Sequence, residues 1–349
     1  MTADNFKFRD YNVVFTALSS CLSIFGAILI FLTYFKGKPE VKNFTRLLLV
    51  YLTIADIMTA VGNLVASIRY DVVHGHKNHY EHCLQNASNI IPDNWSISHT
   101  TVGKTKEHLM WLCKGQSFVT TYSNMSSYLW TLVIAGHLWF SVVFKTQTSE
   151  TTYMHVLYHV VCWLVPLSVV IVLQEKDYLG EDYCYGTGVW CGIRSNLHHK
   201  TIERWMYIAD IGWQVPCYIL TCLVYMHLKL HLYLRHRGKN LDVVSVKLRN
   251  EDTNFVYVWL IIYLLKVWGM TRFFITTYVS QETLQNQHLR TFLGILLSLQ
   301  SYGASGQAFW NCILFCFLDK TVRHSMKDWF CRRTSERRHL LSSSESINR

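Results

Sequence analysis

The feature that most limits the fold of this chain is a series of seven long apolar segments separated by clusters of charge. About 20 apolar residues are enough for a helix to cross the hydrocarbon core of a bilayer. Lipid offers no hydrogen-bond partners to the backbone, so segments of this kind must be helical. The sequence therefore predicts an all-α membrane protein with a seven-transmembrane helix bundle. The segments are residues 11–35, 46–70, 114–144, 152–174, 204–234, 254–279 and 289–318.

The charge content agrees with this prediction. Only 16% of the 349 residues are charged, whereas a soluble domain carries about 25%. The net charge of +10 would suggest nucleic acid in a soluble protein. Here the basic residues gather on one side of the segments, so we expect contact with membrane lipid and none with nucleic acid. The ten residues before the first segment are too few for a cleaved signal peptide and its flank.

The distribution of Lys and Arg predicts that the N-terminus lies outside, because inner loops carry the excess of these residues. With that orientation, the inner pieces 36–46, 145–151, 229–251 and 319–349 hold 19 Lys and Arg in 72 residues. The outer pieces 1–10, 69–114, 174–204 and 280–290 hold 12 in 98.

The same orientation divides the chain into four parts. Residues 1–10 are an extracellular N-terminus and 11–318 the seven-helix domain. Residues 319–331 are expected to form an amphipathic helix on the membrane. The Ser-rich residues 332–349 are expected to be a disordered cytoplasmic tail.

The outer side carries candidates for covalent modification. Four cysteines lie there, namely Cys83, Cys113, Cys184 and Cys191. Four cysteines allow three connectivities, and their spacing does not select one. We expect Cys113 to pair with Cys191, which would tie an outer loop over the mouth of the bundle, and Cys83 and Cys184 to remain for a second pair. Glycosylation sequons begin at Asn86 and Asn94 in the same outer region.

Charged residues inside the segments are expensive in lipid and are candidates for function. Asp56 lies midway along the second segment, Asp210 in the fifth and Lys266 in the sixth. One hypothesis is that an ion pair between Lys266 and one of these acids holds the resting bundle and rearranges on activation; the alternative is a fixed structural pair. Arg272 lies nearer the outside, where it can extend its cation to the interface.

Several short runs give this arrangement a family resemblance. The third segment ends in His137-Leu138-Trp139, not in the acidic-Arg-Tyr run of rhodopsin-like receptors, and the sixth and seventh segments contain no proline. The chain over about 10–331 instead resembles the G-protein-coupled receptors that join the secretin-like receptors with the slime-mould cyclic AMP receptors. The matching runs are Leu-Thr-Ile-Ala-Asp at 52–56, 124–131, Val189-Trp190-Cys191, Val267-Trp268 with Arg272-Phe273, and Gln307 with Asn311-Cys312-Ile313.

The resemblance implies a receptor that passes an extracellular signal to a heterotrimeric G protein, with a lean toward Gq and phospholipase C. It implies no enzyme activity and no cofactor, and it places the chain in the plasma membrane or the ciliary membrane. A small extracellular ligand is expected, because the chain has no large hormone-binding ectodomain. Trp268, Gln307 and Asn311 join the charged residues as candidates for ligand binding or switching. Residues expected to face the G protein are Arg235, Arg237, Lys247 and Arg249.

The tail offers sites for regulation. Glu336 to Leu341 matches an acidic dileucine sorting pattern, and Cys331 is positioned for palmitoylation. Phosphates would add negative charge to this basic segment and allow arrestin or sorting adaptors to dock; an ordinary disordered end is the alternative. The candidate phosphorylation sites are Ser335, Ser342, Ser343, Ser344 and Ser346.

Two further readings concern histidines and transport. His155 and His159 have the i, i+4 spacing of metal ligands but no evident third ligand, so no metal site is predicted. The outer histidines His74, His76, His79 and His82 fit a zinc or acid sensor or a solvated loop. The alternative function is a multi-pass transporter, although internal repeats are not evident and the chain has only four prolines.

Overall fold

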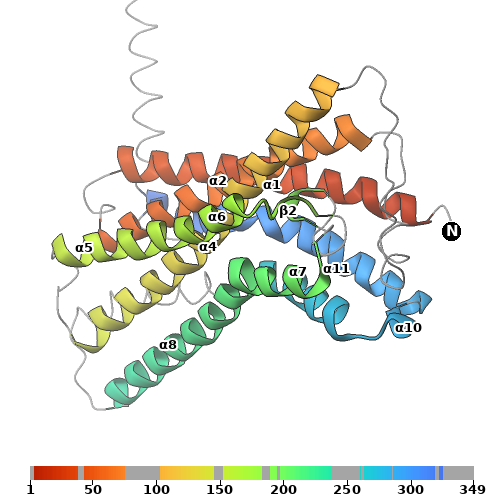
Figure 1. The fold of residues 1–349 in the computed structure, drawn as a ribbon. Coiled ribbons are helices and arrows are strands. Elements are labelled where there is room, and N and C mark those ends of the chain that lie inside the picture. Colours follow the sequence, from red (N-terminus) through yellow and green to blue (C-terminus); the bar gives the residue numbers. More distant parts are fainter. Residues whose placement is uncertain are drawn as a thin grey trace, which may run out of the picture.

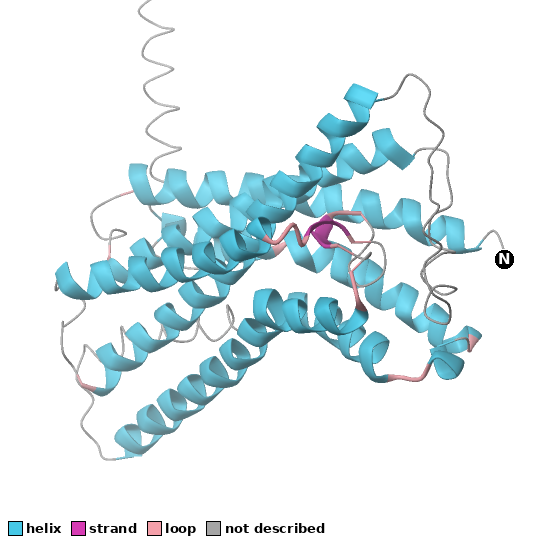
Figure 2. Cartoon of the chain, in the orientation of Figure 1, coloured by secondary structure: helices cyan, strands magenta, loops and turns pink. Residues whose placement is uncertain are grey.

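The structure, a computed structural model, is a bundle of long helices with one short hairpin (Figures 1 and 2). It describes residues 4–37, 43–74, 103–144, 152–182, 189–194, 197–237, 260, 263–284, 286–318 and 322–324. The helices α1 (Asp4–Lys36), α2 (Phe44–His74) and α4 (Gly103–Val143) are single α-helices.

The later membrane segments contain π-helical turns. In the fourth, α5 (Thr152–His159) continues through η3 (Val160–Leu164) into α6 (Val165–Glu175). In the fifth, α7 (His199–Met206) continues through η4 (Tyr207–Ile211) into α8 (Gly212–Arg237). The sixth is helical over 263–278 and is followed by α10 (Gln281–Leu284). The seventh consists of α11 (Gln287–Ser305), α12 (Gln307–Cys312) and η5 (Ile313–Leu318).

Five helices are long and apolar enough to cross a membrane, which confirms a helical membrane-type bundle. They are Tyr11–Lys36, Phe44–Tyr70, His108–Val143, Tyr153–Glu175 and His199–His231. The sixth and seventh segments enter the described structure as helix, with Gln307–Cys316 as a shorter apolar stretch. Their crossing of the membrane stays a prediction.

One boundary differs from the sequence prediction. The third helix begins at Gly103, not at residue 114. Hydropathy locates only the part of a helix that lies in lipid, whereas Lys and other long polar residues readily continue a helix into water. The start of α1, the end of α2, the start of α4 and α10 lie toward the same end of the bundle (Figure 1).

The first helix shows that the bundle is organised for lipid. One of its faces is polar and turned inward: Asn12, Thr16, Ser19, Ser20 and Ser23 are each at most 2% exposed. Its opposite face exposes Leu18, Phe25 and Ile28, among others. Small polar residues between helices and apolar residues outside are the pattern of membrane bundles.

The apolar core centres on Trp130 of α4, which is fully buried. Its ring lies 5.0 Å from that of Tyr51, 5.3 Å from that of His159 and 5.8 Å from that of Trp163, measured between centroids. Aromatic pairs at these separations add to the stabilisation that burial provides. This cluster joins α2, α4 and the fourth membrane segment.

The seventh segment is broken between α11 and α12 without a proline. The Ser23 hydroxyl of α1 donates to the carbonyl of Ser305 and accepts from the Phe309 amide at 3.4 Å. It thereby occupies the place of the direct Phe309-to-Ser305 backbone bond of an α-helix. A side chain inserted in this way is a recognised cause of a helix kink.

The sixth and seventh segments touch backbone to backbone at Gly303. A Cβ atom at this position would lie 2.0 Å from the carbonyl oxygen of Leu265. Only glycine allows this approach, and Gly303 itself is buried. The spacing of the two segments therefore depends on one missing methyl group.

We predict that Gly303→Ala destabilises the bundle by about 2 kcal/mol or more, as overpacking of a core does. The measurement is the thermal unfolding of the purified protein. Gly136→Ala is the matched control, because a Cβ at Gly136 meets nothing within 4 Å. Equal midpoints for the two variants would contradict the proposed backbone contact.

Candidate functional site

One end of the bundle carries a hairpin that is bonded to α4. Strands β1 (Leu179–Glu181) and β2 (Cys191–Ile193) pair antiparallel, with Leu179 opposite Ile193 and Glu181 opposite Cys191. A disulfide joins Cys191 to Cys113 of α4, which is the pairing expected among the three possible ones. Cys83 and Cys184 lie outside the described residues.

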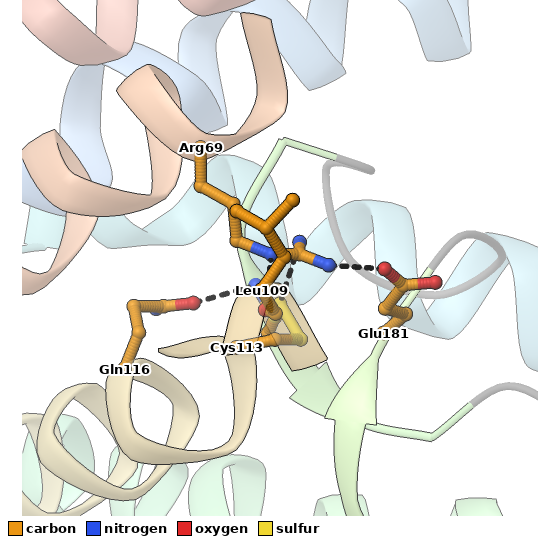
Figure 3. A network of polar contacts seen from close by, with 6 residues as sticks. Arg69, Leu109, Cys113, Gln116 and Glu181 are labelled. Atoms are coloured by element: carbon orange, nitrogen blue, oxygen red, sulfur yellow. Dashed lines mark hydrogen bonds and ion pairs between the residues drawn. A yellow bond between two sulfur atoms is a disulfide. The ribbon is translucent and has the colours of Figure 1, made fainter. Parts of the chain in front are cut away.

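A buried arginine supports this disulfide from the second helix (Figure 3). Arg69 is 6% exposed, and its Nε donates to the carbonyl of Leu109 at 2.9 Å. Its guanidinium also donates to Cys191 Sγ at 3.3 Å and forms an ion pair with Glu181. Gln116 Oε1 of α4 accepts a hydrogen bond from the Cys191 amide at 2.8 Å. One guanidinium thus connects α2, α4 and both strands.

A second ionic contact lies where α6 ends. Asp177 has a positive φ of 54°, a conformation that Asp and Asn tolerate better than most residues. The Tyr178 amide bonds to the carbonyl of Leu173 and the Asp177 amide to that of Gln174, the pattern of a Schellman motif. Asp177 also pairs with Lys114 of α4 and with Arg194, which follows β2. The hydrogen bond from Lys114, together with the charges of Lys114 and Arg194, lowers the pKa of the Asp177 carboxyl.

The centre of the bundle holds a sealed polar network around Asp56, which is 4% exposed. Its Oδ1 accepts from the Ser127 hydroxyl of α4 at 2.8 Å, and its Oδ2 accepts from Asn311 Nδ2 of α12 at 3.2 Å. Gln307 Nε2 donates to Ser127 Oγ at 2.9 Å. The structure therefore brings three sequence candidates, Asp56, Gln307 and Asn311, into one network that joins the second, third and seventh segments.

Two further bonds connect α2 to its neighbours between Asp56 and the hairpin end, one of them at the break in the seventh segment. Asn63 Nδ2 donates to Ser305 Oγ at 2.8 Å, and Thr59 bonds to Ser123 of α4 at 2.7 Å. Because the alternative in lipid is an unpaired polar group, each of these bonds fixes the relative position of two helices.

A second cluster surrounds Tyr128 of α4. The Tyr128 hydroxyl donates to Asp210 Oδ1 at 3.1 Å. Lys266 Nζ lies 5.8 Å from the centre of the Tyr128 ring, a distance typical of cation–π contacts. The Lys266 ammonium donates to Asn124 Oδ1 at 3.1 Å and to the carbonyl of Ala304 at 3.3 Å.

This geometry changes the expectation for Lys266. In the described part of the chain it forms no contact ion pair with Asp56 or Asp210, and the two carboxylates act on it electrostatically from farther away. The reason is that Asn124 and Ala304 supply neutral oxygens within reach. The resting ion pair expected for Lys266 is therefore not what the structure contains.

Arg272 also differs from expectation. It is 3% exposed and donates from Nε to Gln300 Oε1 at 2.8 Å, so its cation stays within the protein and does not extend to the interface. Gln300 passes close to Gly269, where a Cβ would meet it at 3.0 Å. Trp268 lies partly buried on the same helix.

The remaining candidates lie at the end of α8 or outside the described residues. Arg235 and Arg237 belong to the last turn of α8. The candidates outside the described residues are Lys247, Arg249, Asn86, Asn94, Cys331, Ser335, Ser342, Ser343, Ser344 and Ser346. Of the amphipathic helix expected at 319–331, residues 322–324 are described and are helical.

Sequence reasoning missed several residues that the fold makes central. Arg69 was counted only as a basic residue of an outer loop, and Tyr128 and Asn124 only as parts of a matching run. Ser23 belongs to a stripe of polar residues spaced three and four apart in the first segment, the sequence signal that would have marked it. Ser305 carries no such signal, since its role depends on helices far away in the sequence.

Comparison with known proteins shows that the sequence is similar to those of receptors. The family model described as "Slime mold cyclic AMP receptor" matches residues 36–209. The mouse "G-protein coupled receptor 157" is 26% identical over 324 residues, which cover 90% of this chain and 84% of the mouse protein. The human protein of the same name is 27% identical over 314 residues, covering 88% of this chain and 80% of its own length.

A slime-mould relative matches over a shorter part. "Cyclic AMP receptor 4" of Dictyostelium discoideum is 27% identical over 155 residues, or 42% of this chain and 34% of that protein. These comparisons confirm the resemblance inferred from the short matching runs. The relatives are receptors and not enzymes.

The Arg69–Glu181 pair predicts an asymmetric mutational response. Glu181→Gln leaves the guanidinium of Arg69, whose side chain is 5% exposed, without its counter-charge. We expect this change to lower the free energy of unfolding by about 3 kcal/mol. Arg69→Met leaves a carboxylate that is 36% exposed and hydrated, and is expected to cost about 1 kcal/mol. The double variant should resemble Arg69→Met in thermal unfolding. A larger loss for Arg69→Met than for Glu181→Gln would contradict this account.

Asp177 predicts a dependence of stability on pH. Its pKa is lowered in the folded protein, so its ion pairs stabilise the loop above the unfolded pKa and lose this effect as pH falls through the folded pKa. Asp177→Asn keeps a residue that tolerates the positive φ but removes the charge. We expect the difference in unfolding midpoint between wild type and Asp177→Asn to be present at pH 6 and to shrink progressively as pH falls below about 4. A difference independent of pH would assign the effect to backbone geometry alone.

Proposed function

We propose that the chain belongs to the G-protein-coupled receptors that resemble the slime mold cyclic AMP receptors and that it passes an extracellular signal to a heterotrimeric G protein. The observation that carries this proposal is the similarity to "G-protein coupled receptor 157" along 90% of the chain. The Gq pathway, with phosphoinositide and calcium as its readouts, is the coupling proposed first.

The proposed topology has seven spans and an outer N-terminus. Five apolar helices of sufficient length support it. The helix at 263–278 also supports the seven spans. The elements α11, α12 and η5 support them as well, because they pack against α1 in the same bundle. The disulfide between Cys113 and Cys191 also supports it, since structural disulfides persist in oxidising surroundings outside the cell. The proposed location is the plasma membrane, including its ciliary part.

The proposed switch is the polar network around Asp56. It joins the second, third and seventh segments through directional hydrogen bonds, which favour a small number of discrete packings over continuous deformation. A ligand that binds one packing better than another shifts the population toward it. The break between α11 and α12 gives the seventh segment a place to bend during this change.

The proposed inner contacts are electrostatic. Arg235 and Arg237 end α8, and Lys247 and Arg249 belong to the same inner region of the sequence. These residues are proposed to meet the G protein. The tail serines, Cys331 and the dileucine pattern are proposed to serve arrestin, palmitoylation and sorting, and Asn86 and Asn94 to carry glycans.

The test is a panel of G-protein activation biosensors in cells, read without added ligand at matched surface expression. One subtype should be activated above the untransfected level, and Arg235→Gln with Arg237→Gln should lower that signal about fivefold, the size of a coupling free energy near 1 kcal/mol. Lys200→Gln with Arg204→Gln is the control, because this exposed basic pair lies on α7, toward the outer end of the same span.

An equal loss in both double variants would assign the effect to charge in general and not to the inner surface. A flat panel for the wild type at good surface expression would count against spontaneous coupling and turn attention to solute flux, the transporter alternative.

A further inference from the structure

Lys266 carries a charge that its contacts do not neutralise. Its ammonium has three donors, and two of them go to neutral oxygens, those of Asn124 and Ala304. The Tyr128 ring supplies a cation–π contact. A cation in the interior of a membrane bundle normally has an anion as its partner. Lys266 therefore retains capacity for an anionic group.

The Asp210 carboxylate has the opposite charge and, like Lys266, has few hydrogen-bond partners among the described residues. In the part of the chain that the structure describes, its carboxylate accepts one hydrogen bond, from Tyr128. A carboxylate offers about four acceptor positions. The π-helical turn η4 places Asp210 here, opposite Tyr128 and toward the sixth segment.

The two charges differ from Asp56 in their partners. The Asp56 carboxylate is held by both Ser127 and Asn311, whereas that of Asp210 accepts one hydrogen bond in the described part of the chain. As whole residues, Asp210 and Lys266 are also less completely buried than Asp56.

The pair of charges also selects the sign of its ligand. A lone anion at Lys266 would add negative charge beside Asp210 and Asp56, which both act on Lys266. A lone amine at Asp210 would leave Lys266 with neutral contacts only. A ligand with one group of each sign gives both Lys266 and Asp210 a partner of opposite charge and leaves the net charge of this weakly polar interior unchanged.

We propose that Lys266, Tyr128 and Asp210 form a binding site for a small zwitterion, with its carboxylate or phosphate at Lys266 and its ammonium at Asp210. The site would receive the extracellular ligand of the receptor function proposed above, on which its signalling role rests. An anion that draws Lys266 toward itself releases the carbonyl of Ala304, one residue before Ser305 at the break of the seventh segment. Ligand binding would thereby alter the contact that Lys266 makes beside this break.

The test is the thermal unfolding of the full-length protein in lipid nanodiscs with a panel of probes. The panel contains ω-amino acids of increasing chain length, glycerophosphoethanolamine, and the matching n-alkylamines and n-alkylcarboxylates. A bound ligand stabilises the folded state by mass action. We expect stabilisation by zwitterions within a narrow range of lengths and none by the singly charged analogues at the same concentration. Comparison of glycerophosphoethanolamine with the amino acids distinguishes a phosphate from a carboxylate ligand.

Variants locate the effect. Asp210→Asn and Lys266→Met should each raise the half-saturating concentration at least about tenfold, the factor that corresponds to 1.4 kcal/mol. Lys229→Met, at an exposed lysine of α8, should leave it unchanged. If the two variants do not fold, the wild-type panel still decides between zwitterions and single charges.

Three outcomes would overturn the proposal: no stabilisation by any zwitterion, equal stabilisation by an amine or a carboxylate alone, or a response that survives both variants. The measurement contains no G protein. If a zwitterion binds but the biosensor panel stays flat even with that zwitterion added, the binding site stands and the receptor function is contradicted. If the panel responds but no zwitterion binds, the receptor function stands and the binding site is contradicted.

Discussion

Polar side chains inside this bundle must find their partners on neighbouring helices, because lipid supplies none. This constraint explains why Asp56 bonds to Ser127 and Asn311, and why the Ser23 hydroxyl enters the backbone ladder of the seventh segment. Each bond crosses from one segment to another, so that satisfying a polar group and fixing a helix position are the same event. The apolar core around Trp130 adds packing but does not by itself set the register of the helices.

In the seventh segment, contacts of this kind produce a bend without a proline. Rhodopsin-like receptors carry a proline there, whereas this chain bends at Ser305–Gly306 through an inserted hydroxyl, with Asn63 and Lys266 bonded to the residues around the bend. Gly303 brings the sixth segment against its backbone at the same level. A bend built from side chains on three other segments responds to what those side chains bind. This connects the Lys266 cluster to the part of the bundle where α12 contributes Gln307 and Asn311.

The end of the bundle that carries the hairpin is stabilised differently, because several of its charged groups are partly exposed. The hairpin is fixed by the disulfide from Cys113 to Cys191 and by charges that remain partly exposed, Glu181 and Asp177. The Arg69–Glu181 pair lies at the boundary between the buried interior and the surface. The Arg69 guanidinium is buried, while its partner Glu181 reaches solvent. The second and third segments are thereby bonded to the hairpin.

The sequence by itself determined the helical membrane class and the charged residues to examine, because hydropathy and charge are local properties of the chain. It also indicated the receptor resemblance, through short runs such as 52–56 and 124–131. It did not determine partners: Lys266 was expected to face a carboxylate and instead bonds to Asn124 and Ala304, and Arg272 was expected at the interface and instead bonds to Gln300. Only the tertiary structure decided these contacts, since hydrogen bonds between segments up to 286 residues apart depend on helix rotation, on kinks and on glycine contacts that no local pattern records.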